Sequence, residues 1–287
     1  MKILITGSSG FIGKNLFKNL QQDNQVYGIS RRESPTTTYE FDITNPELPL
    51  ILNEINPDII VHCASVKGGV DYSELNKSEA LDNIVGGTYN LAKWALDKKR
   101  KLIHMSTDYV YPGETNNYDE NSGTKPLNFY GKTKLASEAI VSLLDHYAIL
   151  RTTVVFGYDP KGVNFLMQIL KANEKRKIPS DQISNPTSID VLTGYTRGVI
   201  EKGLEGIFVA TGAESMSRYE FTREIARVFG LNMNLFEAVT TKELNQPAIR
   251  PLNNGVNSSR IRNYLNYNPP SVSESLELIK NEQSRNR

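Results

Sequence analysis

Residues 2–13, KILITGSSGFIG, decide the fold. The segment begins with a short β-branched run, Lys2–Thr6, of the kind that a strand buried on both faces shows. Glycines follow at three-residue intervals, and apolar residues then recur every four positions, as on one face of a helix. Glycine lets the backbone approach a pyrophosphate closely, and a helix N-terminus offers unpaired N–H groups. A plain tight turn is the alternative, but the strand and the helix on either side favour a dinucleotide site made by Gly7, Ser9, Gly10, Phe11, Ile12 and Gly13.

Strands and helices alternate beyond this segment. Strands are predicted at Gln25–Ile29, Tyr39–Ile43, Ile59–Ala64, Lys101–Met105 and Ala148–Phe156, with helices at Pro46–Glu54, Ser78–Lys98 and Asn128–His146. This alternation predicts parallel βαβ units and therefore an α/β fold, a Rossmann-type doubly wound parallel sheet. We expect the sheet in residues 1–157 and a smaller C-terminal α/β substrate-binding domain in residues 158–287. Segments at about 187–212 are expected to return to the first domain.

The later part of the chain carries fewer regular patterns. Helices are predicted at Asn164–Ala172 and Asp190–Lys202, and a strand at Ile207–Ala210. Ser217 and Glu220 form a predicted capping box for a helix that Gly230 ends. The residues after Glu282 read as a polar, frayed tail.

The composition excludes several classes of function. The chain has 287 residues, with 33 basic and 32 acidic side chains and a net charge of +1. That balance gives no electrostatic footprint for nucleic acid or an anionic membrane. Cys63 is the only cysteine, so neither an internal disulfide nor a cysteine-rich metal site is expected. The apolar runs are shorter than the roughly 20 residues of a membrane span, and we expect a cytoplasmic protein without a metal.

The end of the second predicted strand indicates which dinucleotide is bound. An NAD-specific site places an acidic residue there, on the ribose hydroxyls, whereas this chain has Ser30, Arg31 and Arg32. Guanidinium groups suit a 2′-phosphate because they make bidentate contacts with phosphate oxygens. Two solvated surface arginines are the alternative. We expect NADPH, with NADH possible.

Two further strand ends are expected beside the cofactor. Asp42 and Ile43 follow the third predicted strand, where the carboxylate would accept from the adenine amine and Ile43 would pack on the ring. An Asp that caps a turn is the alternative for Asp42. Small residues after the fourth strand would leave room for the cofactor, namely Cys63, Ala64 and Ser65. His62 and His104 lie within apolar strands and are expected to be hydrogen-bonded core residues.

A possible proton donor lies on the helix predicted from Asn128. Tyr130 and Lys134 are one helical turn apart and share a face. An ammonium beside a phenol is expected to lower the phenol's pKa from about 10 toward neutrality. Tyr130 would then protonate a carbonyl oxygen that Thr107, at a strand end, holds by a hydrogen bond. Tyr89 and Lys93 have the same spacing but no such strand end before them.

With these residues in place, the chain resembles the extended short-chain dehydrogenase/reductase superfamily, and within it the dTDP-4-dehydrorhamnose reductase family. The general resemblance rests on the glycine motif, the Tyr130–Lys134 pair and the upstream hydroxyl. The more specific resemblance covers segments 106–111, 181–182, 185–188, 250–251 and 257–259, together with Val163-Asn164-Phe165.

The resemblance implies NAD(P)H-dependent reduction of the C4 ketone of a nucleotide-linked 6-deoxyhexose, as in deoxysugar biosynthesis for polysaccharides. Thr107, Tyr130 and Lys134 would form the catalytic triad, and Arg250 would meet the diphosphate or the nearby sugar. The substrate residues would be Thr107, Asp108, Val154, Asn164 and Arg250. Val154 stands where the family usually has Trp, and Phe11-Ile12 where it typically has Gln-Leu.

Other functions remain open within the superfamily. C4 epimerisation would use the same tyrosine and lysine. 4,6-Dehydration is disfavoured because the dehydratases carry Asp-Glu after the threonine, whereas this chain has Asp108-Tyr109. A non-catalytic NADP-binding subunit, similar to the regulatory subunit of methionine adenosyltransferase, would keep the fold without turnover. The apolar helical stripe from Leu81 to Ala95 would be either core or the interface of a homodimer.

Overall fold

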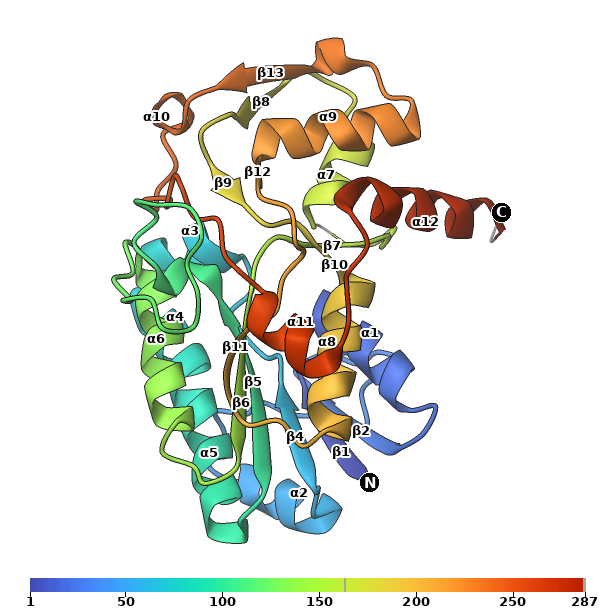
Figure 1. Ribbon diagram of the computed structural model, residues 1–287. Coiled ribbons are helices and arrows are strands. Elements are labelled where there is room, and N and C mark those ends of the chain that lie inside the picture. The colour runs from blue at the N-terminus through green and yellow to red at the C-terminus, as the bar shows by residue number, and fades with distance from the viewer. Residues whose placement is uncertain (163, 286–287) are drawn as a thin grey trace.

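The centre of the molecule is a seven-stranded parallel sheet with the order β11-β6-β5-β4-β1-β2-β3 (Figure 1). A computed structural model describes residues 1–162 and 164–285 of the chain. The strands of the sheet are β1 (Lys2–Thr6), β2 (Gln25–Ser30), β3 (Tyr39–Glu40), β4 (Ile59–His62), β5 (Lys101–Thr107), β6 (Tyr147–Thr152) and β11 (Gly206–Val209). The predicted doubly wound parallel sheet is therefore confirmed.

Helices cover both faces of this sheet. Because successive side chains of a strand point to opposite faces, Ile3 and Ile5 of β1 pack with α1 (Phe11–Leu20) and α8 (Ile189–Glu201). Leu4 packs on the other face with α2 (Leu48–Ile55), α5 (Gly87–Lys98) and the end of α6 (Phe129–Val141). Figure 1 shows α5 and α6 on one side of the sheet and α1 and α8 on the other. These two layers account for the apolar runs of the first half of the chain.

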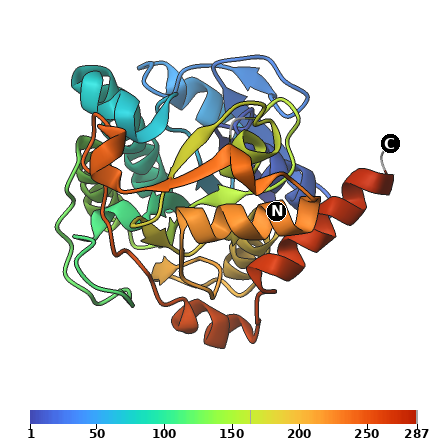
Figure 2. The same cartoon turned by 90° about the horizontal axis from the view of Figure 1, so that it is seen from above.

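A second, smaller core lies beyond the carboxyl ends of the strands. Phe156, Phe221 and Leu276 are fully buried there. They pack with α7 (Phe165–Leu170), α9 (Arg218–Phe229), α12 (Val272–Arg285) and the parallel pair of β8 (Arg176–Pro179) with β13 (Phe236–Val239). Figure 2, the view from above, shows these elements lying over the end of the central sheet.

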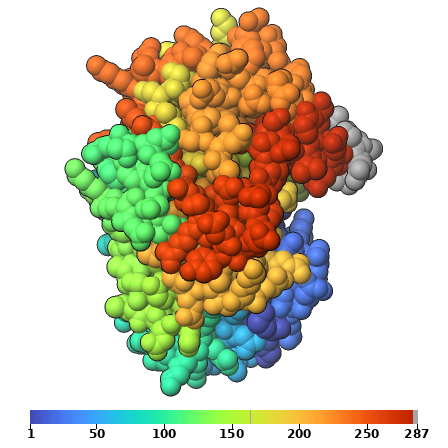
Figure 3. All heavy atoms as spheres, viewed as in Figure 1, coloured from blue at the N-terminus to red at the C-terminus, as the bar shows by residue number. Residues whose placement is uncertain are grey.

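Short elements connect the two cores. They are α3 (Gly69–Leu75), α4 (Lys77–Ala80), β7 (Val155–Phe156), β9 (Ile183–Ser184), β10 (Thr187–Ser188), β12 (Met216–Ser217), α10 (Thr241–Leu244) and α11 (Ser259–Leu265), with η1 (Leu81–Gly86), η2 (Asp108–Val110) and η3 (Met233–Leu235). The chain returns to the first core in α11, where Ile261 is buried, before α12 packs in the second core, and Figure 3 shows this last part as the red surface. In this stretch the Asn254 amide donates to the backbone oxygen and to Oδ2 of Asp108, both at 2.9 Å.

Several predicted elements have different bounds in the structure. The predicted helix Ser78–Lys98 contains the π-helical turn η1, whose six residues change the register of the side chains that follow. Of its apolar stripe, Ile84, Leu91 and Ala95 are core and Leu81 is exposed. The predicted strand Tyr39–Ile43 is only two residues long, because the Asp42 carboxylate accepts from Thr44 N and Oγ1 and forms a turn.

The predicted strand Ala148–Phe156 is also wrong as one element. β6 ends at Thr152, and Val154 has a left-handed backbone with φ 43°, so β7 leaves the central sheet and pairs with β10. The predicted helix from Asn128 ends at Val141 rather than His146. Residues 282–285 of the predicted frayed tail are helical, while residues 286–287 and Val163 lie outside the described residues. The capping box at Ser217 and the left-handed Gly230 are confirmed.

In residues 1–162 and 164–285, no helix combines the length and the apolar character that crossing a lipid bilayer requires.

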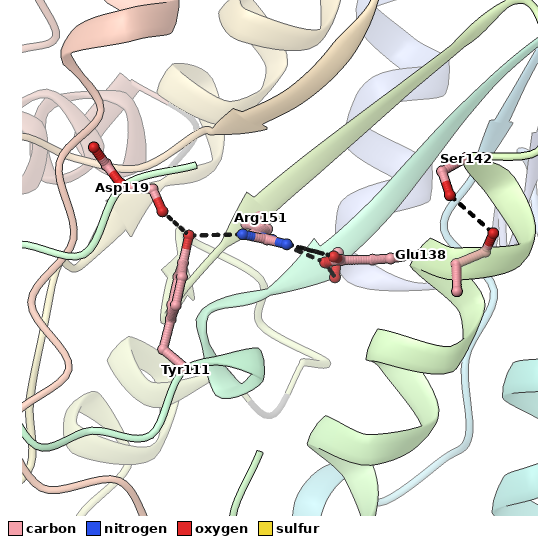
Figure 4. Close-up of polar contacts among 7 residues, drawn as sticks. Tyr111, Asp119, Glu138, Ser142 and Arg151 are labelled. Carbon is pink, nitrogen blue, oxygen red and sulfur yellow. Dashed lines mark hydrogen bonds and ion pairs between the residues drawn. The ribbon is translucent and has the colours of Figure 1, made fainter. Parts of the chain in front are cut away.

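A buried ion pair fixes α6 on the sheet. Arg151 of β6 donates through Nη2 to Glu138 of α6 at 2.7 Å, and the two side chains are only 5% and 4% exposed. The Ser106 hydroxyl donates to the same carboxylate. Arg151 also donates to the Tyr111 hydroxyl at 2.9 Å, which donates in turn to the Asp119 carbonyl (Figure 4). The chain of bonds ties the helix that carries Tyr130 and Lys134 to two strands and a loop.

Removing one member of this pair should destabilise the protein strongly. Arg151→Met or Glu138→Leu leaves an uncompensated buried charge, and each should lower the free energy of unfolding by about 3–5 kcal/mol. The double variant should lose clearly less than the sum, because it buries no lone charge. Urea unfolding followed by the fluorescence of Trp94 measures both losses, and strictly additive losses would contradict the proposed coupling.

Candidate active site

A first cavity lies at the carboxyl ends of β1, β2 and β4. It has a volume of about 460 Å³ and lies beside β1, where the crossovers run in opposite directions to β2 and β4. Ligands bind at such switch points in open parallel sheets. Gly7 has φ 67°, and a Cβ on Gly13 would come within 2.3 Å of the Gly7 oxygen, so both positions require glycine. The predicted residues lining this cavity are Gly7, Ser9, Gly10, Ser30, Arg31, Arg32, Asp42, Ile43, Cys63, Ala64 and Ser65.

The end of β2 gathers cationic groups at this cavity. Ser9 Oγ lies 2.6 Å from Ser30 Oγ, which joins the glycine turn to the strand end. Arg31 donates to Asn83 Oδ1 at 3.0 Å and lies 3.8 Å from the Asp42 carboxylate. Asn83 is part of the π-helical turn η1, and its position in the cavity was missed because no sequence pattern predicted that turn.

Ile43 closes the cavity from the side of α5. The side chain is 7% exposed and belongs to the core beneath the sheet. A Cβ on Gly87 would come within 2.6 Å of Ile43 Cδ1, whereas a Cβ on Gly86 would meet nothing within 4 Å. Of the two adjacent glycines, only Gly87 therefore makes a close approach, and the residue that it approaches, Ile43, lies in a loop. Asp42 forms the predicted alternative, a capped turn, and also lines the cavity.

A second cavity of about 430 Å³ continues from the first. Gly7, Gly10, Cys63 and Ser65 line both. The second cavity brings together the remaining predicted cofactor and catalytic residues with two substrate candidates: Phe11, Ile12, Gly13, Thr107, Asp108, Tyr130, Lys134 and Val154.

The start of α6 sets the direction of Tyr130 and Lys134. Asn128 caps the helix by accepting from Gly131 N at 2.9 Å, and its amide nitrogen donates to Ile249 O at 2.8 Å. Thr107 ends β5, where its hydroxyl donates to Asp108 Oδ1 at 3.1 Å and accepts from Tyr109 N. The strand end and the helix start therefore meet at one cavity.

Burial dominates the proton affinities of this site. It raises the pKa of Tyr130, and the charges of Asp108 and Tyr109 act in the same direction. The predicted lowering by the Lys134 ammonium is wrong for this arrangement: Lys134 Nζ donates to Met105 O at 2.5 Å and lies 3.2 Å from His104 Nε2. Burial lowers the pKa of Lys134 to about 8 and raises that of Asp108 to about 6. A phenol with the ordinary pKa of about 10 is already protonated at neutral pH, so the raised pKa makes Tyr130 a weaker acid than its spacing to Lys134 predicted.

The two histidines differ from each other. His62 is a hydrogen-bonded core residue as predicted, with Thr6 Oγ1 at 2.7 Å and Thr88 Oγ1 at 3.0 Å. His104 contacts Lys134 through Nε2, and its Nδ1 has no partner among the described residues. Burial holds the pKa of both imidazoles well below the usual value, so His104 is neutral beside the lysine.

A third cavity, of about 920 Å³, opens between the two cores and shares Tyr109, Val154, Val155 and Arg218 with the second. Asn164 lines it, but its amide caps α7 and donates to Gly157 O. Arg250 also lines it and forms a 2.6 Å ion pair with Asp71.

Arg218 was missed as a site residue. A cation in the first turn of a helix opposes the helix dipole, and this was the available signal.

In the described part of the chain, no three His, Cys, Asp or Glu side chains are grouped so as to hold a metal ion.

The parallel sheet, the glycine turn and the Thr107, Tyr130 and Lys134 side chains around adjoining cavities define an extended short-chain dehydrogenase/reductase. The family model described as RmlD substrate binding domain matches residues 1–284. The chain therefore belongs to the dTDP-4-dehydrorhamnose reductase family.

Three relatives illustrate this membership. The chain is 29% identical over 294 residues to a dTDP-4-dehydrorhamnose reductase of Aggregatibacter actinomycetemcomitans, covering 97% of this chain and 98% of that protein. It is 29% identical to the methionine adenosyltransferase 2 subunit beta of Rattus norvegicus, covering 91% and 81%. The crystal structure of a dTDP-4-dehydrorhamnose reductase from Bacillus anthracis in complex with NADP superimposes with a TM-score of 0.88 at 30% identity, covering 98% and 99%.

The two adjacent glycines of α5 and η1 provide a matched test of the first cavity. Gly86→Ala should raise the free energy of unfolding by roughly 0.5–1 kcal/mol, because alanine costs less backbone entropy in a helix and meets no neighbour. Gly87→Ala should lower it by about 1 kcal/mol or more and push Ile43 toward the cavity. Urea unfolding and a fluorescence titration with NADPH report the two effects. Equal NADPH affinity of the two variants would contradict the placement of Ile43 at the cofactor.

Proposed function

We propose that the protein reduces the C4 ketone of a nucleotide-linked 6-deoxy sugar with NADPH. One observation carries the proposal: the cavity of Thr107, Tyr130 and Lys134 opens on one side into the glycine-rich cavity and on the other into the 920 Å³ cavity. A dinucleotide in the first and a nucleotide sugar in the third would meet at Tyr130. The names of the Aggregatibacter and Bacillus relatives support the same reaction class.

The residues of the middle cavity suit a carbonyl reduction. NADPH, when bound, supplies the hydride. The Tyr130 phenol donates its proton to the C4 oxygen, and the Thr107 hydroxyl, turned from Asp108 Oδ1 toward the substrate, donates a hydrogen bond to the same oxygen. Lys134 lines the same cavity as Tyr130, and its ammonium would hydrogen-bond to the cofactor ribose. The Lys134 ammonium donates to the Met105 carbonyl and contacts His104 Nε2, and both contacts fix its position.

The substrate would occupy the cavity between the two cores. Arg250 meets the diphosphate, while Asp108, Val154 and Asn164 face the sugar and its surroundings. The segments of residues 158–287 that line the 920 Å³ cavity act as the substrate-binding domain. Residues 1–157, with about 187–212, act as the cofactor domain. Val154 replaces the tryptophan of the family and removes a large aromatic contact surface, so the sugar differs from 4-dehydrorhamnose in its bulk near that wall.

A second candidate function is a non-catalytic NADP-binding subunit. The observation that favours it is the 29% identity to methionine adenosyltransferase 2 subunit beta, which equals the identity to the Aggregatibacter reductase. Turnover of a 4-keto nucleotide sugar separates the two candidates, because a binding subunit consumes no NADPH.

The cofactor preference depends on Arg31 and Arg32. Arg31→Ala should lower the affinity for NADPH by about 10-fold, because a hydrogen bond to a charged group contributes about 1.5–3 kcal/mol, and should leave the NADH affinity nearly unchanged. The ratio of the two dissociation constants, measured by fluorescence titration, reports the effect. A ratio near one in the unchanged protein would contradict the assignment.

Tyr130 can be tested by activity and binding together. Tyr130→Phe removes the proton donor and should lower kcat by roughly 100-fold or more on a panel of dTDP-, UDP- and GDP-linked 4-keto sugars. NADPH should still bind to this variant. Lys134→Ala should lower both kcat and the NADPH affinity. Turnover by Tyr130→Phe at the unchanged rate would refute the role of the phenol, and no NADPH consumption by the unchanged protein on any of the sugars would refute the reductase.

A further inference from the structure

Arg218 lies where the second cavity, here called the catalytic cavity, meets the third, here called the substrate cavity. It is the first residue of α9, directly after the N-cap Ser217, whose capping box with Glu220 fixes the start of the helix. The Arg218 backbone nitrogen donates to Gln182 O at 3.1 Å. Its side chain lines both cavities, whereas Arg250 lines the substrate cavity and is not part of the catalytic one. Of these two arginines, Arg218 is the nearer to the reacting centre.

The charge of Arg218 is not balanced by an ion pair. Arg151 and Arg250 hold carboxylates at 2.7 and 2.6 Å, but no carboxylate of the described residues lies within 4.0 Å of the Arg218 guanidinium. The guanidinium stacks over the Phe165 ring at 5.2 Å and interacts with the Tyr109 phenol, neither of which carries a negative charge. Burial lowers the pKa of Arg218, and the charge of Arg250 acts in the same direction. Tyr109 and Asp108 act in the opposite direction but do not outweigh burial, so the charged form is held there at a cost.

The nearest carboxylate is engaged elsewhere. Asp108 accepts hydrogen bonds from the Thr107 hydroxyl and the Asn254 amide, so its oxygens are held toward those groups. The helix dipole adds to the imbalance, because the first turn of α9 is its positive end. A buried guanidinium without an ion pair at the positive end of a helix is unfavourable. Such arrangements are expected at functional sites, where a bound ligand supplies the missing negative charge.

The wall beside Arg218 is strained as well. Val154 lines the same two cavities and has φ 43°, a conformation that costs a β-branched residue roughly 1–3 kcal/mol. Such strain clusters at ligand sites. The Arg218 guanidinium is planar and buried beside Val154, and such a group is suited to bidentate binding of phosphate or carboxylate oxygens.

We propose that Arg218 binds an anionic oxygen group of the nucleotide sugar and so selects for a charged ligand next to the reacting carbon. The proposal rests on the substrate class of the proposed function. The group is either the phosphate nearest the sugar or a carboxylate carried by the sugar ring. Both would place two oxygens on the guanidinium and relieve its repulsion with Arg250.

Binding measurements without turnover test this assignment. Arg218→Met keeps an apolar stem over Phe165 and removes the charge, and Arg223→Met is the matched control, an exposed arginine of the same helix. The probes are uridine, thymidine, UDP-glucose, dTDP-glucose and UDP-glucuronic acid, each titrated calorimetrically into the NADPH-bound protein. Arg218→Met should weaken the charged probes by about 10- to 100-fold and leave the nucleosides unchanged. Arg218→Lys should recover part of the loss.

The probes also separate the two sources of the anion. Equal losses for UDP-glucose and UDP-glucuronic acid support the phosphate, and a larger loss for UDP-glucuronic acid supports the carboxylate. Unchanged affinities in Arg218→Met, equal losses for the nucleosides, or equal losses in Arg223→Met would overturn the proposal. NADPH affinity and circular dichroism show that each variant is folded. Because no reaction is measured, the result stands apart from the ketoreductase assay.

Discussion

The ion pair of Glu138 and Arg151 is the contact on which the geometry of the site depends. It lies one helical turn beyond Lys134 and joins α6 to β6 inside the molecule, where both side chains are nearly without solvent. Two charges in such a place are tolerable only when each satisfies the other, so the helix has one position in which the pair closes. Since Tyr130 and Lys134 belong to the same rigid helix, that position also fixes the phenol and the ammonium against the end of β5.

Low solvent access dominates the electrostatics of the second cavity, which Thr107, Tyr130 and Lys134 line. It raises the pKa of Tyr130 and Asp108 and lowers that of Lys134. For Asp108 and Lys134 it outweighs neighbouring charges of opposite effect, whereas for Tyr130 the neighbouring charges act in the same direction. The raised pKa makes the Tyr130 phenol a weaker acid, since proton transfer is most efficient from a group whose pKa lies near the working pH. The glycine turn contributes in a different way: it uses missing side chains at Gly7 and Gly13 to let the backbone come close to a ligand.

The sequence predicted the central sheet, the glycine turn and the caps at Asn128 and Ser217, because each depends on residues within a few positions of one another. Prediction from the sequence failed for features whose conformation depends on contacts between distant parts of the chain. The register change at η1 that brings Asn83 to Arg31 and the left-handed turn at Val154 involve segments far apart in the chain. The short β3 has a local cause, the turn that Asp42 forms with Thr44. The pKa of Tyr130 was predicted in the wrong direction, because spacing reveals the neighbouring lysine but not the depth of burial. The sequence does show Arg218 as a cation at the start of a helix. That feature indicates a ligand site only together with the absence of an ion pair among the described residues, which the structure alone reveals.

The hydrogen bonds from Asn254 to Asp108 have a consequence for biosynthesis. The two residues are 146 positions apart, and the helices that follow Asn254 pack against both cores. Synthesis must therefore have passed Asn254 before the carboxylate beside Thr107 gains this partner. All seven strands of the central sheet precede Asn254, so the sheet can form during translation before Asp108 acquires this hydrogen bond.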